Sequence, residues 1–459
     1  MKDMTLRQIA AAIRGELHYG AQGYSAGDAK ADVAGVVLDS RKCDRDYLFI
    51  ATVGERVDGH DFVGQVMEKG AAAAVVEKVP SVDCTYILVE DSFKALKDLA
   101  AWYRSRLDVR IVGIVGSVGK TSTKEFVASV LSVKYKTLKT EGNLNNEVGM
   151  PLTILKIREE HEVAVIEMGI SDFGEMTRLA EIARPDYAIY TNIGQCHLEN
   201  LKTREGILQA KTELLPYLKA DAPVIINGDD DMLVRIGETR AVIPYGRGEN
   251  CKVRSLKEEP KGLFGTDCVI SDDAGSFEVH VPLPGAHMVL NALAATAAGR
   301  AFRMTNGEIR QGIEACRSVG GRSNIISTGH YTLIDDCYNA NPVSMKAAID
   351  LLSLADTRKV AVLGDMFELG ADEASLHADV GAYAAAKGID LILATGKLSL
   401  HMYNAAKEKS AGEVRYFESR EELLRALHEE GLLRINDTIL IKASHGMGFQ
   451  AVVESLSSL

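Results

Sequence analysis

The sequence contains no long hydrophobic run, because charged residues interrupt every apolar stretch before the ~18 consecutive apolar residues of a membrane span. The N-terminal segment carries charges throughout and lacks the apolar core of a secretory signal peptide. The 7 cysteines are scattered and include no C-x-x-C pair, which argues against a disulfide framework or a zinc knuckle. These absences predict a cytoplasmic protein without a membrane span.

Positive charge is also scarce, since 52 Lys and Arg residues are outnumbered by 64 Asp and Glu residues, giving a net charge of −12. No basic run of the kind that contacts nucleic acid occurs, so no nucleic-acid partner is expected. The hydrophobic fraction of 46% is typical of a globular chain with a large core. At roughly 150 residues per domain, the length suggests about three domains.

Short runs rich in β-branched residues alternate with longer helical patterns, an order typical of parallel sheets built from strand–helix–strand units. We therefore expect an α/β fold of three domains, at residues 1–107, 108–317 and 318–459. Residues 241–283 differ, because their alternating polar runs predict an antiparallel insertion. The paired glycines in residues 318–322 predict a hinge about which the third domain closes over the second when ligands bind.

The strongest motif is Gly113-Ile-Val-Gly-Ser-Val-Gly-Lys-Thr-Ser122, which follows a predicted strand and opens a predicted helix. Its glycines let backbone N–H groups turn toward phosphate oxygens, and the helix N-terminus adds a positive dipole. Ile114 stands where an ordinary Walker A motif has its first glycine, so the pattern is the shorter G-x-x-G-K-T. Lys120 would reach the phosphates and the Thr121 hydroxyl would ligate Mg²⁺. The alternative is a glycine turn with an incidental Gly-Lys-Thr.

Polar side chains follow several predicted strands, where the ligands of open α/β sheets bind. Glu167 ends an apolar run, a costly position for a carboxylate that has no cation or hydrogen bonds. His197 lies just beyond the next predicted strand. With Thr121, these residues suit Mg²⁺ bridging phosphates better than structural zinc. The alternative for His197 is an ordinary loop histidine.

Lys211 lies at the centre of an apolar stripe in the predicted helix over residues 204–218. A lysine on an inner face must find a counter-charge, lose its proton or be chemically modified. The pattern alone favours the alternative, in which the stem is buried and the ammonium reaches water.

The loop of residues 141–147 contains three asparagines before an apolar run. Helix capping and turn formation explain at least one of them. Amide donors aimed at a polar or anionic substrate are the alternative.

In chain order, G-x-x-G-K-T, T-E-G-N-L-N-N-E-V-G-M-P, E-M-G, T-N-I-G-Q-C-H and A-K-T-E-L resemble the central domain of the Mur ligases. These cytoplasmic enzymes form ATP-driven amide bonds in peptidoglycan precursor synthesis. Asp39-Ser-Arg41 and Asp58-Gly-His-Asp-Phe62 are similar to the uridine-nucleotide domain of the members that add the third and the final peptide pieces. Asp335-Asp-Cys-Tyr-Asn-Ala-Asn-Pro342 and Leu363-Gly-Asp-Met-Phe-Glu-Leu-Gly370 resemble the members that add D-alanyl-D-alanine. The D-N-P-R signature of the tripeptide-forming members is absent.

The resemblance implies a small α/β uridine-nucleotide domain, a central P-loop mononucleotide-binding α/β domain and a C-terminal Rossmann-like α/β domain. It implies a monomeric, ATP- and Mg²⁺-dependent ligase that joins D-alanyl-D-alanine to UDP-N-acetylmuramoyl-tripeptide through an acyl phosphate, releasing ADP and phosphate. Such an enzyme serves cell-wall synthesis, and through it cell shape and division. The alternatives are a Mur-type or folylpolyglutamate-type ligase with another acceptor amino acid, and a non-catalytic regulator gated by nucleotide.

The resemblance also assigns individual residues. It places ATP contacts at Gly116, Ser117, Val118, Gly119, Lys120, Thr121, Ser122, Asn291, Arg322, Asp336 and Tyr338. Metal ligands fall at Thr121, Glu167, His197 and Lys211, and UDP-precursor contacts at Ser40, Arg41, Asn143 and Asn146. The expected catalytic residues are Lys120, Lys211, His197 and Arg322, with the lysine at position 211 a carbamate in several family members. One departure occurs in the last strand, where the family pattern K-x-S-R is replaced by Lys442-Ala-Ser-His445.

Overall fold

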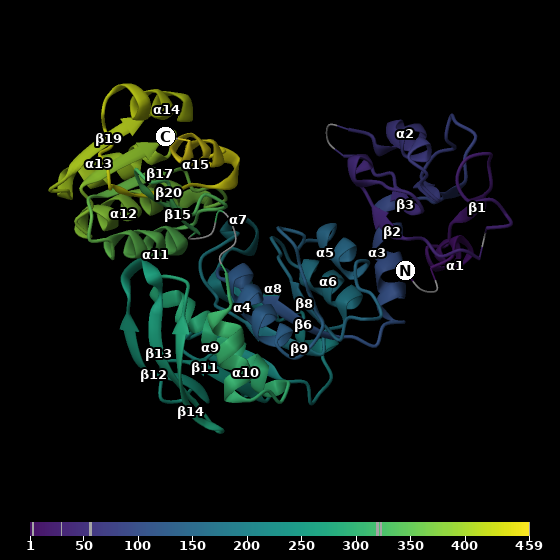
Figure 1. Ribbon diagram of the computed structural model, residues 1–459, viewed down its shortest axis with the longest axis horizontal. Helices are drawn as coiled ribbons and strands as arrows, with labels where there is room; N and C mark the ends of the chain where they lie inside the picture. The colour runs from purple at the N-terminus through teal and green to yellow at the C-terminus, as the bar shows by residue number, and fades with distance from the viewer. Residues whose placement is uncertain (2–3, 29, 55–56, 318–320, 322–323, 459) are drawn as a thin grey trace.

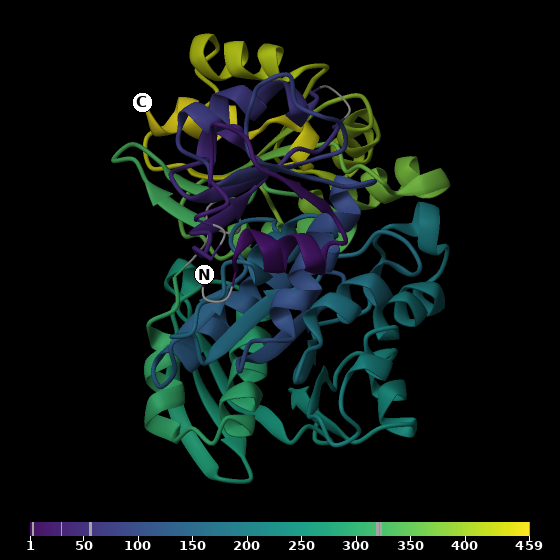
Figure 2. The same cartoon turned by 90° about the vertical axis from the view of Figure 1, so that its right-hand side faces the viewer.

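The computed structural model describes residues 1–459 except residues 2–3, 29, 55–56, 318–320, 322–323 and 459. Within the described residues, the strands form three separate sheets of 5, 9 and 6 strands, each from a different stretch of the chain. The three-part α/β fold predicted from the sequence is confirmed. The N-terminal and C-terminal units both lie on the same side of the middle unit (Figures 1 and 2). The predicted hinge at residues 318–322 lies outside the described residues, apart from Gly321.

The N-terminal sheet has the strand order β1-β5-β4-β3-β2, in which β1 is antiparallel to β5 and the other pairs are parallel. Helices α1 and α3 pack on one face, and α2 packs on the other. The elements are α1 (Leu6–Ala12), β1 (Glu16–His18), β2 (Gly35–Val37), η1 (Ser40–Lys42), β3 (Tyr47–Ile50), η2 (Gly59–Phe62), α2 (Val63–Glu68), β4 (Ala73–Val76), β5 (Tyr86–Leu88) and α3 (Ser92–Arg104).

Helix α3 joins the N-terminal and middle units, because it also packs against α5 and α6 of the middle unit. Its first turn is capped by Asp91, whose side chain accepts a hydrogen bond from Lys94 N. Leu96 and Leu99 belong to one continuous apolar cluster that extends from the N-terminal sheet into the middle unit. The two units therefore share a core along this helix.

The middle sheet has the order β14-β13-β12-β11-β10-β9-β6-β8-β7. Helices α5, α6 and α8 cover one face, and α4, α9 and α10 cover the other. The first elements are β6 (Arg110–Val115), α4 (Lys120–Ser132), β7 (Thr137–Lys139), α5 (Gly149–Ile154), β8 (Val163–Glu167), α6 (Glu175–Ala183), β9 (Tyr187–Tyr190), α7 (Leu198–Leu201), α8 (Arg204–Thr212) and η3 (Leu215–Tyr217). They are followed by β10 (Val224–Asn227), η4 (Leu233–Glu238), β11 (Val242–Gly246), β12 (Val253–Pro260), η5 (Gly262–Phe264), β13 (Thr266–Asp272), β14 (Gly275–Val281), α9 (Ala286–Ala301) and α10 (Asn306–Glu314).

The predicted antiparallel insertion begins later than expected. Strand β11 pairs in parallel with β10, and only β12, β13 and β14 form antiparallel pairs. The prediction was wrong for β11 because residues 228–241, which include η4, return the chain to the other end of the sheet before the strand starts.

The C-terminal sheet has the order β15-β16-β20-β17-β18-β19, with an antiparallel β15–β16 pair at one edge and parallel pairs elsewhere. Helices α11, α12 and α13 pack on one face, and α14 and α15 pack on the other. The elements are β15 (Asn324–Ser327), β16 (Thr332–Asp335), α11 (Pro342–Ser353), β17 (Lys359–Gly364), η6 (Gly370–Asp372), α12 (Glu373–Ala386), β18 (Leu391–Thr395), α13 (Ser399–Lys409), β19 (Glu413–Phe417), α14 (Arg420–Glu429), β20 (Thr438–Lys442), η7 (His445–Met447) and α15 (Gln450–Ser457).

Candidate active site

The glycine-rich motif forms a tight turn between β6 and α4. A Cβ atom on Gly116 would lie 1.9 Å from Thr191 Oγ1, so a side chain there would clash. Gly119 has a φ of 79° and immediately precedes the first residue of α4, which favours glycine at this position. The segment that follows β9 holds the turn in place, since Asn192 Oδ1 accepts a hydrogen bond from Val118 N at 3.0 Å. The turn therefore has a fixed shape and leads into a helix N-terminus, a position suited to phosphate.

A buried carboxylate lies beside the first turn of α4. Glu167, at the end of β8, is 2% exposed. Its Oε2 accepts a hydrogen bond from Thr121 Oγ1 at 2.9 Å, and its Oε1 accepts one from Asn145 Nδ2 at 2.8 Å. Lys124 Nζ lies 3.8 Å from the same Oε2. The structure thus brings together Thr121 and Glu167, which the sequence predicted to act on one metal ion.

Asn145 and Lys124 were missed by the sequence reasoning, which chose Asn143 and Asn146 from the same loop. Asn146 Oδ1 accepts a hydrogen bond from Gly149 N at 2.8 Å and so caps the start of α5. The carbonyl of Asn143 accepts from Asn145 N at 2.8 Å, within the turn. The available signal for Lys124 was its spacing of four residues from Lys120, which places both on one side of α4.

Lys211 is buried at 1% exposure in α8, so its ammonium does not reach solvent as the helical pattern alone had favoured. The backbone there is fixed, because Tyr190 Oη donates a hydrogen bond to Lys211 O at 3.2 Å. In the described part of the chain, the Lys211 ammonium has no hydrogen bond or ion pair. Burial is the main cause that lowers the pKa of Lys211 to about 8; Cys196 opposes this shift, and the charge of Lys120 contributes to it.

His197 lies immediately before α7 and contacts the C-terminal unit. Its Nδ1 is 3.0 Å from Glu368 Oε2, in the turn that follows β17. Burial lowers the pKa of His197, Glu368 opposes this effect, and the charges of Lys211 and Lys120 add to it. His197, Lys211 and Lys120 are therefore within electrostatic reach of one another.

Asn291 of α9 also borders the phosphate-binding turn. Its Oδ1 accepts a hydrogen bond from Thr123 Oγ1 at 2.8 Å, and a Cβ atom on Gly119 would lie 3.6 Å from the same oxygen. Ser122 precedes Thr123 and is half-buried in the first turn of α4. The predicted nucleotide residues from α4 and α9 thus share one neighbourhood.

The predicted nucleotide residues of the C-terminal unit gather at the carboxyl ends of β16 and β20. Lys442 Nζ forms an ion pair with Asp336 Oδ2 at 2.6 Å. The Tyr338 ring lies 5.7 Å from the His445 ring, centroid to centroid, so the residue that departs from the family pattern contacts an aromatic side chain. Arg322, also predicted to bind nucleotide, lies outside the described residues.

The residues predicted to bind a uridine nucleotide follow β2 in the N-terminal unit. Ser40 is buried, and its carbonyl accepts a hydrogen bond from Lys69 Nζ at 2.7 Å. The Arg41 guanidinium makes two hydrogen bonds of 2.9 Å to Asp39 while its side chain stays 86% exposed. Arg41 is therefore a solvent-facing cation whose position is fixed by a neighbouring carboxylate.

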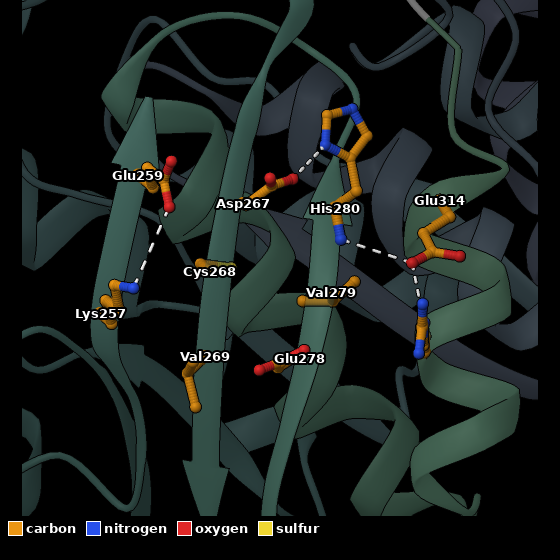
Figure 3. Close-up of a pocket in the computed structure, with 10 residues that line it drawn as sticks. Lys257, Glu259, Asp267, Cys268, Val269, Glu278, Val279, His280 and Glu314 are labelled. Carbon is orange, nitrogen blue, oxygen red and sulfur yellow. Dashed lines mark hydrogen bonds and ion pairs between the residues drawn. The ribbon is translucent and has the colours of Figure 1, made fainter. Parts of the chain in front are cut away.

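A cavity of about 330 Å³ lies elsewhere, over β12, β13, β14 and α10 (Figure 3). Most of its charged lining residues are paired with one another: His280 Nδ1 is 2.7 Å from Asp267, and Arg310 Nε is 2.8 Å from Glu314. These charges are already compensated, so the cavity is a weaker candidate for catalysis than the phosphate-binding turn.

Two features are absent from the described residues. No helix there is long and apolar enough to cross a bilayer. No group of three or more His, Cys, Asp or Glu side chains there is arranged to hold a metal ion. A metal at the phosphate-binding turn would therefore need ligands beyond these side-chain types.

A phosphate-binding turn on a parallel sheet, with a buried Thr–Glu pair beside it and a second α/β unit in contact with it, defines a nucleotide-dependent enzyme of several domains. The chain belongs to the Mur ligase family. Residues 114–299 match the Mur ligase middle domain, residues 321–445 match the Mur ligase glutamate ligase domain, and residues 32–111 match the Mur ligase family catalytic domain.

Individual relatives are similar along most of the chain. The UDP-N-acetylmuramoyl-tripeptide--D-alanyl-D-alanine ligase of Bacillus subtilis is 38% identical over 431 residues, covering 92% of this chain and 93% of the relative. The crystal structure of MurF from Acinetobacter baumannii has a TM-score of 0.88 at 31% identity and covers 99% of both chains. MurF ligase from Thermotoga maritima, in complex with ADP, has a TM-score of 0.79 at 28% identity, covering 92% of this chain and 97% of that one.

Proposed function

We propose that this chain is the ATP-dependent ligase that joins D-alanyl-D-alanine to UDP-N-acetylmuramoyl-tripeptide in peptidoglycan synthesis. The observation that carries the proposal is the buried Thr121–Glu167 pair at the phosphate-binding turn. The full-length similarity to ligases of this activity supports the choice of substrates. The proposal includes a monomeric enzyme in the cytoplasm and domains at residues 1–107, 108–317 and 318–459.

The chemistry requires activation, because a carboxylate is a poor electrophile. In the first step, a carboxylate oxygen of the tripeptide attacks the γ-phosphorus of ATP, and ADP leaves. In the second, the amine of D-alanyl-D-alanine attacks the acyl carbon, loses a proton and expels phosphate. The protein contributes positioning and charge stabilisation, through the N–H groups of the turn and the ammonium of Lys120.

The residues present suit Mg²⁺. Glu167 is buried, and its carboxylate and the Thr121 hydroxyl are hard oxygen ligands only 2.9 Å apart. Mg²⁺ takes one or two protein ligands and draws the rest from phosphate and water, which agrees with a site of this composition. When bound, Mg²⁺ would neutralise charge on the phosphate oxygens. Asn145 and Lys124 hold the carboxylate in place from its other sides.

Lys211 is proposed to act as a carbamate. Its neutral amine would add to carbon dioxide, forming an N–C bond and releasing one proton, so that a buried positive charge is replaced by a negative one. The burial of the Lys211 side chain, for which the described residues provide no hydrogen bond or ion pair, supports this assignment. Two carboxylate-like oxygens in this place would, with His197, provide a second set of metal ligands.

The remaining assignments complete the two substrate sites. Asn291, Arg322, Asp336 and Tyr338 are proposed to contact the nucleotide together with residues 116–122. Ser40, Arg41, Asn143 and Asn146 are proposed to contact the UDP-precursor.

Phosphate release with defined substrates tests the proposed function. With ATP and UDP-N-acetylmuramoyl-tripeptide, D-alanyl-D-alanine should support turnover, whereas single amino acids should not. Lys120→Ala should abolish turnover at an unchanged Tm, because it removes a charge that stabilises the transferring phosphoryl group. Equal turnover with a single amino acid would indicate a different ligase. Nucleotide binding without turnover with any acceptor would indicate a regulator.

A further inference from the structure

We propose that Glu368 of the C-terminal unit is a positioning residue for the reaction in the middle unit. It would hold the imidazole of His197 in one orientation, so that the phosphate site is completed only when the C-terminal unit is docked. This inference rests on the proposed function, in which His197 contributes to that site.

The contact between the two residues is direct. Glu368 Oε2 lies 3.0 Å from His197 Nδ1, and the two residues come from different sheets. A carboxylate that accepts a hydrogen bond from Nδ1–H fixes the tautomer of a histidine and leaves Nε2 as the nitrogen with a free lone pair. Carboxylates that orient a histidine in this way also set the direction of its ligand-binding nitrogen.

The backbone of both residues is strained. His197 has a φ of 50° and Glu368 a φ of 61°, values that few residues other than glycine adopt. Such conformations cost on the order of 1 kcal/mol or more and persist where the surroundings determine them. Both residues are therefore held at positive φ by the structure around them.

Hydrogen bonds to buried side chains fix the turn that carries Glu368. Met366 N donates a hydrogen bond to Nε2 of the fully buried His377 at 2.9 Å. Phe367 N donates to Ser444 Oγ, also at 2.9 Å. The two residues before Glu368 are therefore held by buried side chains, so the carboxylate is presented from a rigid support.

The segment that leads to His197 is connected to the phosphate-binding turn. Gly194 N donates a hydrogen bond to Ser117 Oγ at 3.0 Å, and Ser117 N donates to Asn192 O at 3.0 Å. Ile193 N donates to Asp230 Oδ2 at 2.8 Å. Because the segment before His197 and the phosphate-binding turn are joined by hydrogen bonds, a change in the orientation of His197 alters one border of this turn.

The simpler explanation is an ordinary surface ion pair. The side chains of His197 and Glu368 are 29% and 67% exposed, and pairs with such exposure contribute about 0–1 kcal/mol to stability. The contact is thus too weak to hold the two units together. Loss of Glu368 should therefore leave the Tm unchanged, and a positioning role must show in the tautomer of His197 and in kcat.

The test compares Glu368→Ala and Glu368→Gln with Glu373→Ala, which removes an exposed carboxylate at the start of α12. The first measurement is the side-chain ¹⁵N spectrum of histidine-labelled full-length protein without substrates, in which His197→Gln identifies the His197 signals. The wild type and Glu373→Ala should show His197 protonated at Nδ1. Glu368→Ala should shift the signals toward the Nε2–H tautomer, whereas Glu368→Gln, whose amide oxygen still accepts, should not.

The second measurement is ligation. Glu368→Ala should lower kcat by about 10- to 100-fold, with KM for ATP within about twofold and the Tm unchanged, and Glu368→Gln should recover most of the loss. An unchanged tautomer and kcat in Glu368→Ala would overturn the inference, as would a loss of kcat that follows a lowered Tm. If the wild type does not ligate D-alanyl-D-alanine, the proposed function fails, whereas the tautomer measurement still decides the contact.

Discussion

Two lysines in the middle unit are equally buried, but they differ in the hydrogen-bonding and charged groups near their ammonium groups. Lys124 in α4 and Lys211 in α8 are each 1% exposed. Lys124 Nζ donates to Thr140 O at 2.7 Å and lies 3.2 Å from Glu125 and 3.8 Å from Glu167. For Lys211, the described residues provide no such partner, and burial lowers its pKa.

The difference shows that burial of a charge does not by itself indicate function. A buried lysine among carboxylates is a structural element, because its charge is compensated and it keeps Glu167 in place. A buried lysine without a counter-charge destabilises the fold, so its retention requires another explanation. The proposed carbamate supplies that explanation for Lys211.

The largest change in the free energy of unfolding is expected when Lys124 is substituted. Lys124→Met leaves Glu125 and Glu167 without their buried cation and should lower the free energy of unfolding by about 3–5 kcal/mol. Lys139→Met is the matched control, because Lys139 pairs with the same Glu125 from a side chain that is 45% exposed. The control should change stability by less than about 1 kcal/mol. Urea unfolding measures both, and equal effects would remove the distinction between the two sites.

Substitution of Lys211 is expected to change the free energy of unfolding in the opposite direction. In buffer without bicarbonate and Mg²⁺, Lys211→Met should raise the free energy of unfolding by about 3 kcal/mol, because each unit of the lowered pKa corresponds to about 1.4 kcal/mol. The same substitution should abolish ligation. Short-chain carboxylates should partly restore activity to Lys211→Ala by filling the vacated space. Full activity of Lys211→Ala without additives would show that this lysine is not a ligand.

The pH dependence of stability tests the lowered pKa of Lys211. The pKa of Lys211 falls from 10.5 to about 8 on folding, so the unfolded chain binds this proton more tightly. The destabilising effect is complete below about pH 8 and disappears as the pH rises toward 10.5. The difference in unfolding free energy between wild type and Lys211→Met should therefore shrink over this range. A constant difference would indicate that the pKa of Lys211 is the same in the folded and unfolded protein.

The smallest effects are expected in the asparagine loop. Asn146→Ala removes the cap of α5 and should cost about 1 kcal/mol of stability. Asn145→Ala removes a donor to Glu167 Oε1 and should lower kcat about tenfold at a smaller cost in stability. Denaturation and phosphate release, measured on both variants, separate the two roles. The assignment of Asn145 would be wrong if only Asn146→Ala lowered kcat.

Much of the fold follows from local pattern. The strand predicted before the glycine-rich motif is present as β6, because its buried β-branched residues are typical of a central parallel strand. Strand β4 gives a weaker signal in the sequence, since two of its four residues are alanine, which has little preference for strands. Glu167 could be predicted from its position at the end of a strand, because the carboxyl ends of parallel strands meet at one edge of the sheet, where ligands bind.

The rest of the site depends on contacts between distant segments. Helical spacing placed Lys211 on an inner face, but only the fold shows that it lacks the carboxylates that surround Lys124. Glu368 was not predicted, because its partner His197 belongs to another sheet and no local pattern connects them. Asn145 differs from its neighbours only in the direction of its side chain.

In the proposed reaction ATP activates the tripeptide carboxylate, and transfer of an isotope from that carboxylate to phosphate tests this step directly. The enzyme would be given UDP-N-acetylmuramoyl-tripeptide with ¹⁸O at both oxygens of the reacting carboxylate, together with ATP and D-alanyl-D-alanine. If the acyl phosphate forms, each phosphate released should carry one ¹⁸O atom, because the carboxylate oxygen leaves with the phosphoryl group. Release of phosphate without ¹⁸O would contradict it.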